Sequence, residues 1–412
     1  MAQGYGWLKA GLEKAHCDPL HSFVGIRAMP FTPGQLATAI LFASCTGVSG
    51  HGALIHPPSR NAVDRSLPEF VDGKWPEHSD GCNCAGEKGG CPAASARANG
   101  GGQACLWFSQ GCAIGCPSCT SLHGHTNKSL CKNPTTGPTI NDPKLRTMNI
   151  RAAAGSADDV FMYNPWRAPG SAPVTDPCGM AGGAPKPVAA DAALFAQTKF
   201  AMQGDLGSHV LKPAPSGTVW SAGSTVEVVW GIRYNHGGGY SYRLCPANEP
   251  LTEECFQRMP LNFTGMPSLR WNDGKEMFYK GVYVSEGTHP PGSMWARNPI
   301  PRIDDSPEDS GEPADDTWCH DPAVGIGCRA FEPVCEEETN PPWHKIDSGA
   351  RSSDVEGFCS GDWTGGVLVD RIKIPASLAP GEYVLGWRWD CEETAQIWQN
   401  CADITISAPI VV

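Results

Sequence analysis

Two histidines in this sequence are placed where they could hold a metal ion. His51 follows the small residues VSG and opens the stretch HGALIHPPSR, residues 51–60. A histidine that becomes the first residue of a chain offers two nitrogens, because its α-amine and its ring Nδ1 close a six-membered chelate on one metal. The amine has a pKa of roughly 8, so a metal displaces its proton easily at neutral pH.

The second histidine, His236, lies in VVWGIRYNHGGGYSYRLCP, where it ends a predicted strand and precedes three glycines. Glycines leave room for another part of the chain to approach closely. Three nitrogens in one plane suit Cu(II), and the affinities of divalent metals peak at copper. Taken alone, His236 would be interpreted as a polar residue of a hairpin loop. Together with an N-terminal His51, we interpret it as a copper ligand. His209 and His56 are the next candidates.

The segment LATAILFASCTGVSG, residues 36–50, predicts the cleavage that would expose His51. A short apolar run is followed by small residues, with Val48 and Gly50 at positions −3 and −1. The run is too short to span a bilayer. The residues before it are unusual for a signal peptide, so we interpret Met29 as the true start and residues 1–28 as a gene-model extension. A genuine long n-region is the alternative.

Composition favours a secreted, disulfide-bonded protein. The net charge of −12 would become −13 after cleavage and argues against a nucleic-acid or membrane partner. Of the 19 cysteines, 17 follow residue 50, which in a secreted chain indicates disulfides. CPSC at 116–119, followed by HGH, also resembles a zinc site, but we favour disulfides. Sequons at Asn127 and Asn262 suit a secreted glycoprotein.

The strand pattern predicts one all-β domain over residues 51–412. Abundant glycine and proline separate short runs that alternate or are rich in valine, which is typical of an antiparallel β-sandwich. Two insertions interrupt the pattern: a Cys/Gly-rich one at about 73–135 and an acidic one at about 265–360. The expected strands are 224–234, 240–246, 365–374, 382–391 and 397–406.

Three places in the chain resemble lytic polysaccharide monooxygenases, which are secreted copper enzymes with an immunoglobulin- or fibronectin-like sandwich. His51-Gly52 with PPSR at 57–60 looks like the mature start of that family. NHGGGYSYRLCP looks like the family's segment that carries the second histidine. GEYVLGWRWDCEETAQIWQNCADITI looks like its closing strands. The resemblance covers roughly 51–60, 205–262 and 362–408. It is strongest to eukaryotic members and to insect and bacterial chitin-active members of the chitin-binding type-4 kind.

The resemblance implies roles for four residues. His51 and His236 would bind one copper. Trp398 stands where the family usually has Tyr or Phe on the copper axis, and Gln396 would be its hydrogen-bonding neighbour; plain core packing is the alternative for Trp398. In the family, an external electron donor reduces the copper, and O2 or H2O2 is the co-substrate. Oxidation at C1 or C4 of a sugar then breaks the glycosidic bond.

Other residues have weaker assignments. Glu392 and Glu393 either reach the oxygen-binding side or are surface carboxylates. Trp75, Trp107 and Trp166 either stack on sugars or are buried. We expect a monomer acting on a polysaccharide surface such as chitin or cellulose. A glycan-binding protein without turnover and a copper-binding or copper-delivery protein are the alternatives.

Processing supplies the first testable prediction. Material secreted by a eukaryotic host should begin HGALI, because the apolar run and the small residues at 48 and 50 direct cleavage before His51. N-terminal sequencing checks this. A different first residue would defeat the chelate, since an internal His51 has no free amine.

Overall fold

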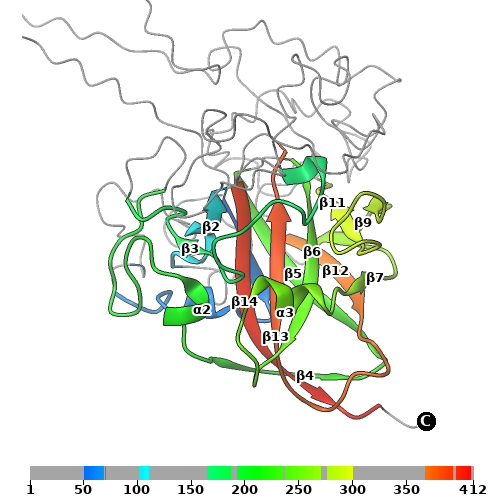
Figure 1. The fold of residues 1–412 in the computed structure, drawn as a ribbon. Coiled ribbons are helices and arrows are strands. Elements are labelled where there is room, and N and C mark those ends of the chain that lie inside the picture. The colour runs from blue at the N-terminus through cyan, green and yellow to red at the C-terminus, as the bar shows by residue number, and fades with distance from the viewer. Residues whose placement is uncertain are drawn as a thin grey trace, which may run out of the picture.

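The predicted β-sandwich is confirmed. The computed structural model describes residues 51–68, 70, 102–110, 165–186, 193–234, 237–270, 276–299, 367–392 and 396–409. Within these residues two sheets pack face to face, with the pair β13 and β14 in front of β5 and β12 in Figure 1. The helices in these ranges are few and short.

The first sheet has the order β1-β5-β12-β8-β9, with β7 also paired to β12. Its described strands are β1 (His51–His56), β5 (Thr225–Tyr234), β7 (Asn262–Phe263), β8 (Ser268–Arg270), β9 (Glu276–Phe278) and β12 (Val367–Lys373). All its pairings are antiparallel.

The second sheet has the order β10-β11-β6-β13-β14-β2-β3, and β4 runs parallel to the end of β14. Its described strands are β2 (Trp107–Gln110), β3 (Met180–Ala181), β4 (Pro215–Ser221), β6 (Gly239–Pro246), β10 (Tyr283–Val284), β11 (Trp295–Arg297), β13 (Gly381–Asp390) and β14 (Gln396–Ser407). The helical elements within the described residues are α2 (Gly207–Val210), α3 (Glu253–Gln257) and three 3-10 turns, Arg60–Ala62, Ala104–Leu106 and Pro165–Arg167.

The five strands expected from the sequence correspond to β5, β6, β12, β13 and β14, within two residues at each end. The sequence pattern did not indicate β1 or β4. Both predicted insertions contain residues that belong to the sheets, because β2 falls within 73–135 and β8 to β11 fall within 265–360. Among the described residues, no helix is long and apolar enough to cross a membrane.

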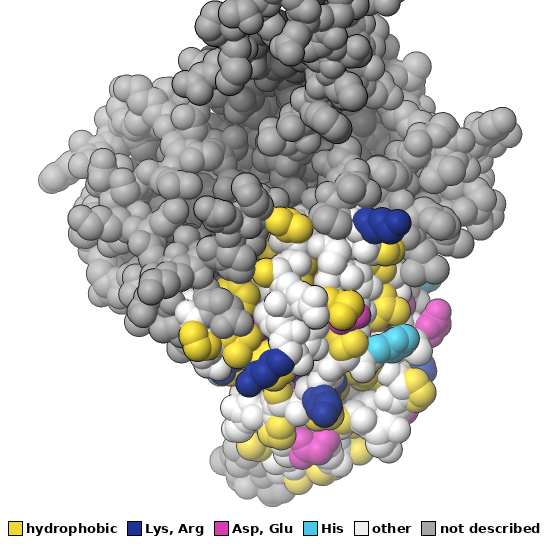
Figure 2. Space-filling view, turned by 90° about the vertical axis from the view of Figure 1, so that its left-hand side faces the viewer, with side chains coloured by type: hydrophobic (Ala, Val, Ile, Leu, Met, Phe, Trp, Pro, Cys, Tyr) yellow, Lys and Arg dark blue, Asp and Glu magenta, His cyan; other side chains and the backbone are white. Residues whose placement is uncertain are grey.

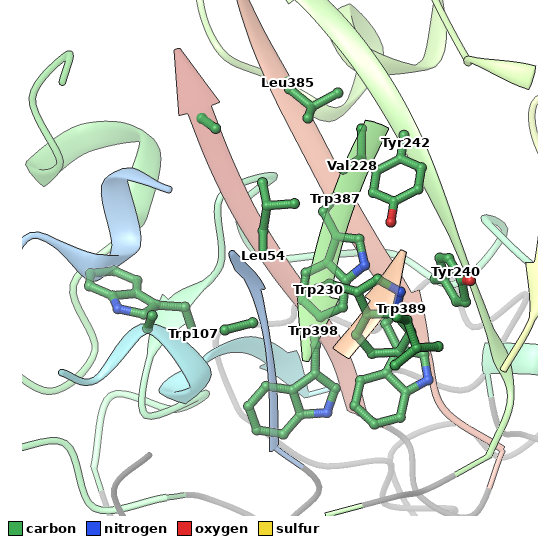
Figure 3. Packing of buried hydrophobic residues seen from close by; sticks show 14 of the residues in the cluster. Leu54, Trp107, Val228, Trp230, Tyr240, Tyr242, Leu385, Trp387, Trp389 and Trp398 are labelled. Atoms are coloured by element: carbon green, nitrogen blue, oxygen red, sulfur yellow. The ribbon is translucent and has the colours of Figure 1, made fainter. Parts of the chain in front are cut away.

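Large aromatic rings fill the space between the sheets (Figure 3). Trp230 of β5 lies with its ring centroid 5.1 Å from that of Trp387 and 5.4 Å from that of Trp389, both on β13. All three side chains are fully buried. Indoles bury more apolar area than any other side chain, so a few of them dominate the core of this sandwich.

Several charged side chains of the described residues pair below the surface. Figure 2 shows Lys, Arg, Asp and Glu side chains standing apart from one another among apolar and uncharged surface on the face that it presents. In contrast, the fully buried Arg388 donates to Asp390 at 2.6 Å and to Glu253 of α3 at 2.9 Å. Since buried charges need partners, this cluster holds α3 against the second sheet.

Two disulfides lie within the described residues and bear out the predicted use of cysteine. Cys178–Cys401 joins the loop before β3 to β14, and Cys245–Cys255 joins β6 to α3. The cysteines of the CPSC segment at 116–119 lie outside the described residues, as do Asn127 and its sequon. The other sequon residue, Asn262, is exposed on β7.

A carboxyl group is buried in the core on β12. Asp370 is 1% exposed, and the hydroxyls of Tyr240 and Tyr242 donate to its two oxygens at 3.0 and 2.8 Å. Burial raises the pKa of Asp370 from 3.8 to about 7, although the two hydrogen bonds oppose the shift. The folded state therefore holds this proton more tightly than the unfolded chain does.

Replacing Asp370 by Asn should change how stability depends on pH. A raised carboxyl pKa stabilises the fold fully below about pH 4 and loses that contribution as pH rises towards about 7. Asp370→Asn has no carboxyl group to ionise. The free energy of unfolding of the variant, relative to that of the wild type, should therefore rise across that pH range by up to about 4 kcal/mol. Chemical denaturation at pH 4 and pH 8 measures it. Parallel pH profiles for the two proteins would contradict the assignment.

Candidate metal centre

The strand register places the backbone of His51 beside the end of the strand that leads to His236. His51, the first residue of β1, pairs with Tyr234, the last residue of β5. His236 follows Tyr234 by two residues. The backbone of His51 is described, whereas its ring and the whole of His236 lie outside the described residues. This is the end at which β13 stops and β14 starts, at the upper edge of the sandwich in Figure 1.

The first strand is held in place by contacts to β14. The Leu54 amide donates to Asn400 Oδ1 at 2.7 Å. Arg60 makes a two-pronged ion pair with Asp403, with Nε to Oδ2 at 2.8 Å and Nη2 to Oδ1 at 2.5 Å. Asn61 accepts from the Cys401 amide at 2.9 Å. The PPSR motif thus has a structural task, because its arginine fixes the chain that follows β1.

The turn that follows His236 is also fixed by hydrogen bonds. Gly237 and Gly238 both have a positive φ, 61° and 70°, which favours glycine over residues with a Cβ. The Gly238 amide donates to Glu392 Oε2 at 3.2 Å, and the Gly238 carbonyl accepts from the Asn298 amide at 2.9 Å. The close approach expected of these glycines is confirmed.

Glu392 is a buried residue, so the surface alternative for it was wrong. It is 2% exposed, and its Oε2 lies 3.7 Å from the Nη2 of Arg297, which is 4% exposed. Burial lowers the pKa of Arg297, and the charge of Glu392 opposes that change. The neighbouring Glu393 lies outside the described residues.

Trp398 is fully buried in the core cluster. Its ring centroid lies 4.2 Å from that of Phe108 on β2 and 6.5 Å from that of Trp389, and Figure 3 shows Trp389 and Trp398 side by side. Because side chains alternate along a strand, Trp398 shares a face of β14 with Asn400, and this face turns towards β1, where Asn400 accepts from the Leu54 amide. Gln396, also buried, belongs to the same face by alternation. Their roles at a metal remain predictions.

Two of the three proposed sugar-stacking tryptophans are core residues. Trp107 and Trp166 are each 1% exposed, so neither can stack on a polymer at the surface. Trp107 packs edge-on against Phe195, with centroids 5.3 Å apart, and Trp166 clusters with Trp295. Trp75 lies outside the described residues. Sequence patterns alone did not separate buried from exposed indoles.

His56 and His209, the next candidates for the second ligand, do not lie at the end of the sandwich where β1 starts. His56 closes β1, at the opposite end of the strand from His51, and burial lowers its pKa, with Glu227 opposing. His209 is exposed on α2. The described residues contain no group of three or more His, Cys, Asp or Glu that could hold a metal. The backbone of His51 lies opposite the end of the strand that leads to His236, and the role of these two residues as copper ligands stays a prediction.

No protein-family model matches the chain. Solved structures that match the chain include a lytic polysaccharide monooxygenase from Thermobia domestica in the Cu(I) state (17% identity, 48% of this chain, 66% of that chain, TM-score 0.22). A chitin binding domain from Burkholderia pseudomallei matches at 11% identity over 87% of this chain and 100% of that chain (TM-score 0.30). A protein of the CBM33 type from Bacillus amyloliquefaciens, in complex with Cu(I), matches at 10% identity over 87% and 100% (TM-score 0.23). The chain spans just under two thirds of the length of the Thermobia protein.

The burial of Trp398 leads to a prediction. Trp398→Ala should lower the free energy of unfolding by about 3–5 kcal/mol, because it leaves a cavity between Phe108 and Trp389. If Trp398 also lies on the copper axis, the electron paramagnetic resonance spectrum of the copper-loaded variant should change. Denaturation and resonance measured on the same preparation separate the two roles. A large stability loss with an unchanged spectrum would leave Trp398 as a core residue only.

Proposed function

We propose that this protein is a secreted copper-dependent monooxygenase or peroxygenase that oxidatively cleaves glycosidic bonds in a polysaccharide such as chitin or cellulose. The observation that carries the proposal is the pairing of His51 with Tyr234. This pairing puts His51, the residue that we expect to begin the mature chain, beside the strand that leads to His236. An N-terminal chelate from His51 and a second imidazole from His236 would then come from β1 and from the segment that follows β5.

The chain's own residues would hold and shield the metal. After cleavage, His51 would supply its amine and ring, and His236 its ring. Copper, when bound, would supply the one-electron chemistry that activates O2 or H2O2. Phe108, Trp389 and Trp398 make the interior next to β1 apolar, which limits access of water from inside the sandwich. The buried contacts of β1 keep its first residue in a fixed position.

The test uses the copper-loaded secreted protein with ascorbate and a panel of polysaccharides, read by mass spectrometry. We expect oxidised oligosaccharides that depend on copper and on the reductant. His236→Ala should abolish them and weaken copper binding strongly, because it removes one of three nitrogens. His209→Ala is the matched control: it removes an exposed histidine of α2 and should behave like the wild type.

Each other outcome would indicate a different function or a different ligand. Binding to one polysaccharide without oxidised products would indicate a glycan-binding protein. Copper binding with consumption of peroxide, but no product from any polysaccharide, would indicate a copper-binding protein. Loss of copper binding in His209→Ala, with none in His236→Ala, would show that the second ligand has been assigned to the wrong histidine.

A further inference from the structure

The indole of Trp389 touches the backbone next to each of the two histidines. Its Nε1 donates to the carbonyl oxygen of Gly237 at 2.8 Å, and Gly237 directly follows His236. The opposite side of the ring meets β1: a Cβ added at Gly52 would lie 2.9 Å from Cζ3 and 3.0 Å from Cε3 of Trp389. Gly52 directly follows His51. One fully buried ring therefore spans the gap between the two chain segments.

The close packing around Trp389 requires glycine at positions 52 and 238. A side chain at Gly52 would overlap the indole, so β1 approaches Trp389 as closely as a backbone can. A Cβ at Gly238 would lie 2.0 Å from the carbonyl oxygen of Asp390, so the turn after His236 also presses on the end of β13. The end of β13, which carries Trp389, thus contacts both β1 and the turn that follows His236.

We propose that Trp389 is a positioning residue that sets the separation between His51 and His236, and through it the geometry and affinity of the copper site. The proposal rests on the proposed function, because it assigns these histidines to one metal. The ring acts as a spacer against β1, and its N–H fixes the turn that follows His236. Trp389 itself has no contact with the metal in this role.

The experiment compares two matched variants of the full secreted protein. Trp389→Phe keeps an apolar ring but removes the N–H donor. Trp387→Phe makes the same change two residues earlier on the same face of β13. Trp387 is equally buried, and its Nε1 has no hydrogen-bond partner in the described part of the chain. Cu(II) affinity is measured by calorimetry and the site geometry by electron paramagnetic resonance.

We expect Trp389→Phe to weaken Cu(II) binding about 10-fold, in the range found when groups that orient metal ligands are lost, and to shift the copper resonance. Trp387→Phe should match the wild type in both measurements. Equal effects of the two variants, or no effect of either, would overturn the proposal. A shifted spectrum is the decisive readout, because a general loss of stability does not move it.

A second pair of variants tests the spacer side of the ring. Gly52→Ala places a methyl 2.9 Å from Trp389, and Gly386→Ala places one 2.9 Å from the ring of Phe256 on the other face of β13. Neither glycine has a positive φ. Both changes should lower the melting temperature, but only Gly52→Ala should weaken copper binding. A matching loss of affinity in Gly386→Ala would overturn the spacer role.

Failure of the proposed function remains distinguishable from failure of this inference. If the wild type binds no Cu(II), the proposed function is wrong. Hydrogen exchange of the peptide that contains residues 237–240 then decides the role of Trp389. Faster exchange in Trp389→Phe than in Trp387→Phe supports a ring that fixes the turn, and equal exchange rejects it.

Discussion

The buried ion pair between Arg60 and Asp403 is the contact on which the placement of the candidate site depends. Among the described strands, the six-residue β1 lies at the edge of its sheet and has a neighbour on one side only. Arg60 ties the chain after β1 to β14, and Leu54 and Asn61 add hydrogen bonds to the same strand. Removing one partner of such a pair would leave an uncompensated buried charge, which typically costs about 3–5 kcal/mol. Arg60, nine positions after His51, thus helps to hold β1 against β14.

Much of the fold could be predicted from the sequence, because its long strands carry a strong pattern. STVEVVWGIRY and EYVLGWRWDC are long enough for valine and aromatic content to indicate strands, and both do form β5 and β13. HGALIH offered only six residues, and its strand forms because β5 provides a partner far away in the sequence. The partner of Arg60 could not be predicted, since Asp403 lies 343 residues further on and many other acids are equally available.

The histidines of the candidate site were proposed from sequence motifs, whereas the residues that support their backbone could not be predicted. The motifs were a cleavage signal before His51 and the glycines after His236. Glu392 could not be placed, because its burial depends on Arg297 of β11, a strand within the predicted acidic insertion. The sequence left open whether Trp107 and Trp166 are buried or exposed, for a similar reason. Their neighbours, Phe195 and Trp295, come from separate parts of the chain that no local pattern links.

Trp398 belongs to a row of rings that ends in a glycine on each side. Phe108, Trp398 and Trp389 lie in sequence across β2, β14 and β13. At one end, a Cβ at Gly183 would lie 2.0 Å from the ring of Phe108, and at the other, one at Gly52 would lie 2.9 Å from Trp389. An indole at position 398 needs more room than a phenol, and cores tolerate added volume poorly. The two glycines supply that room by removing side chains at the ends of the row. The large ring of Trp398 and the absence of a side chain at Gly52, next to His51, therefore belong to the same packing arrangement.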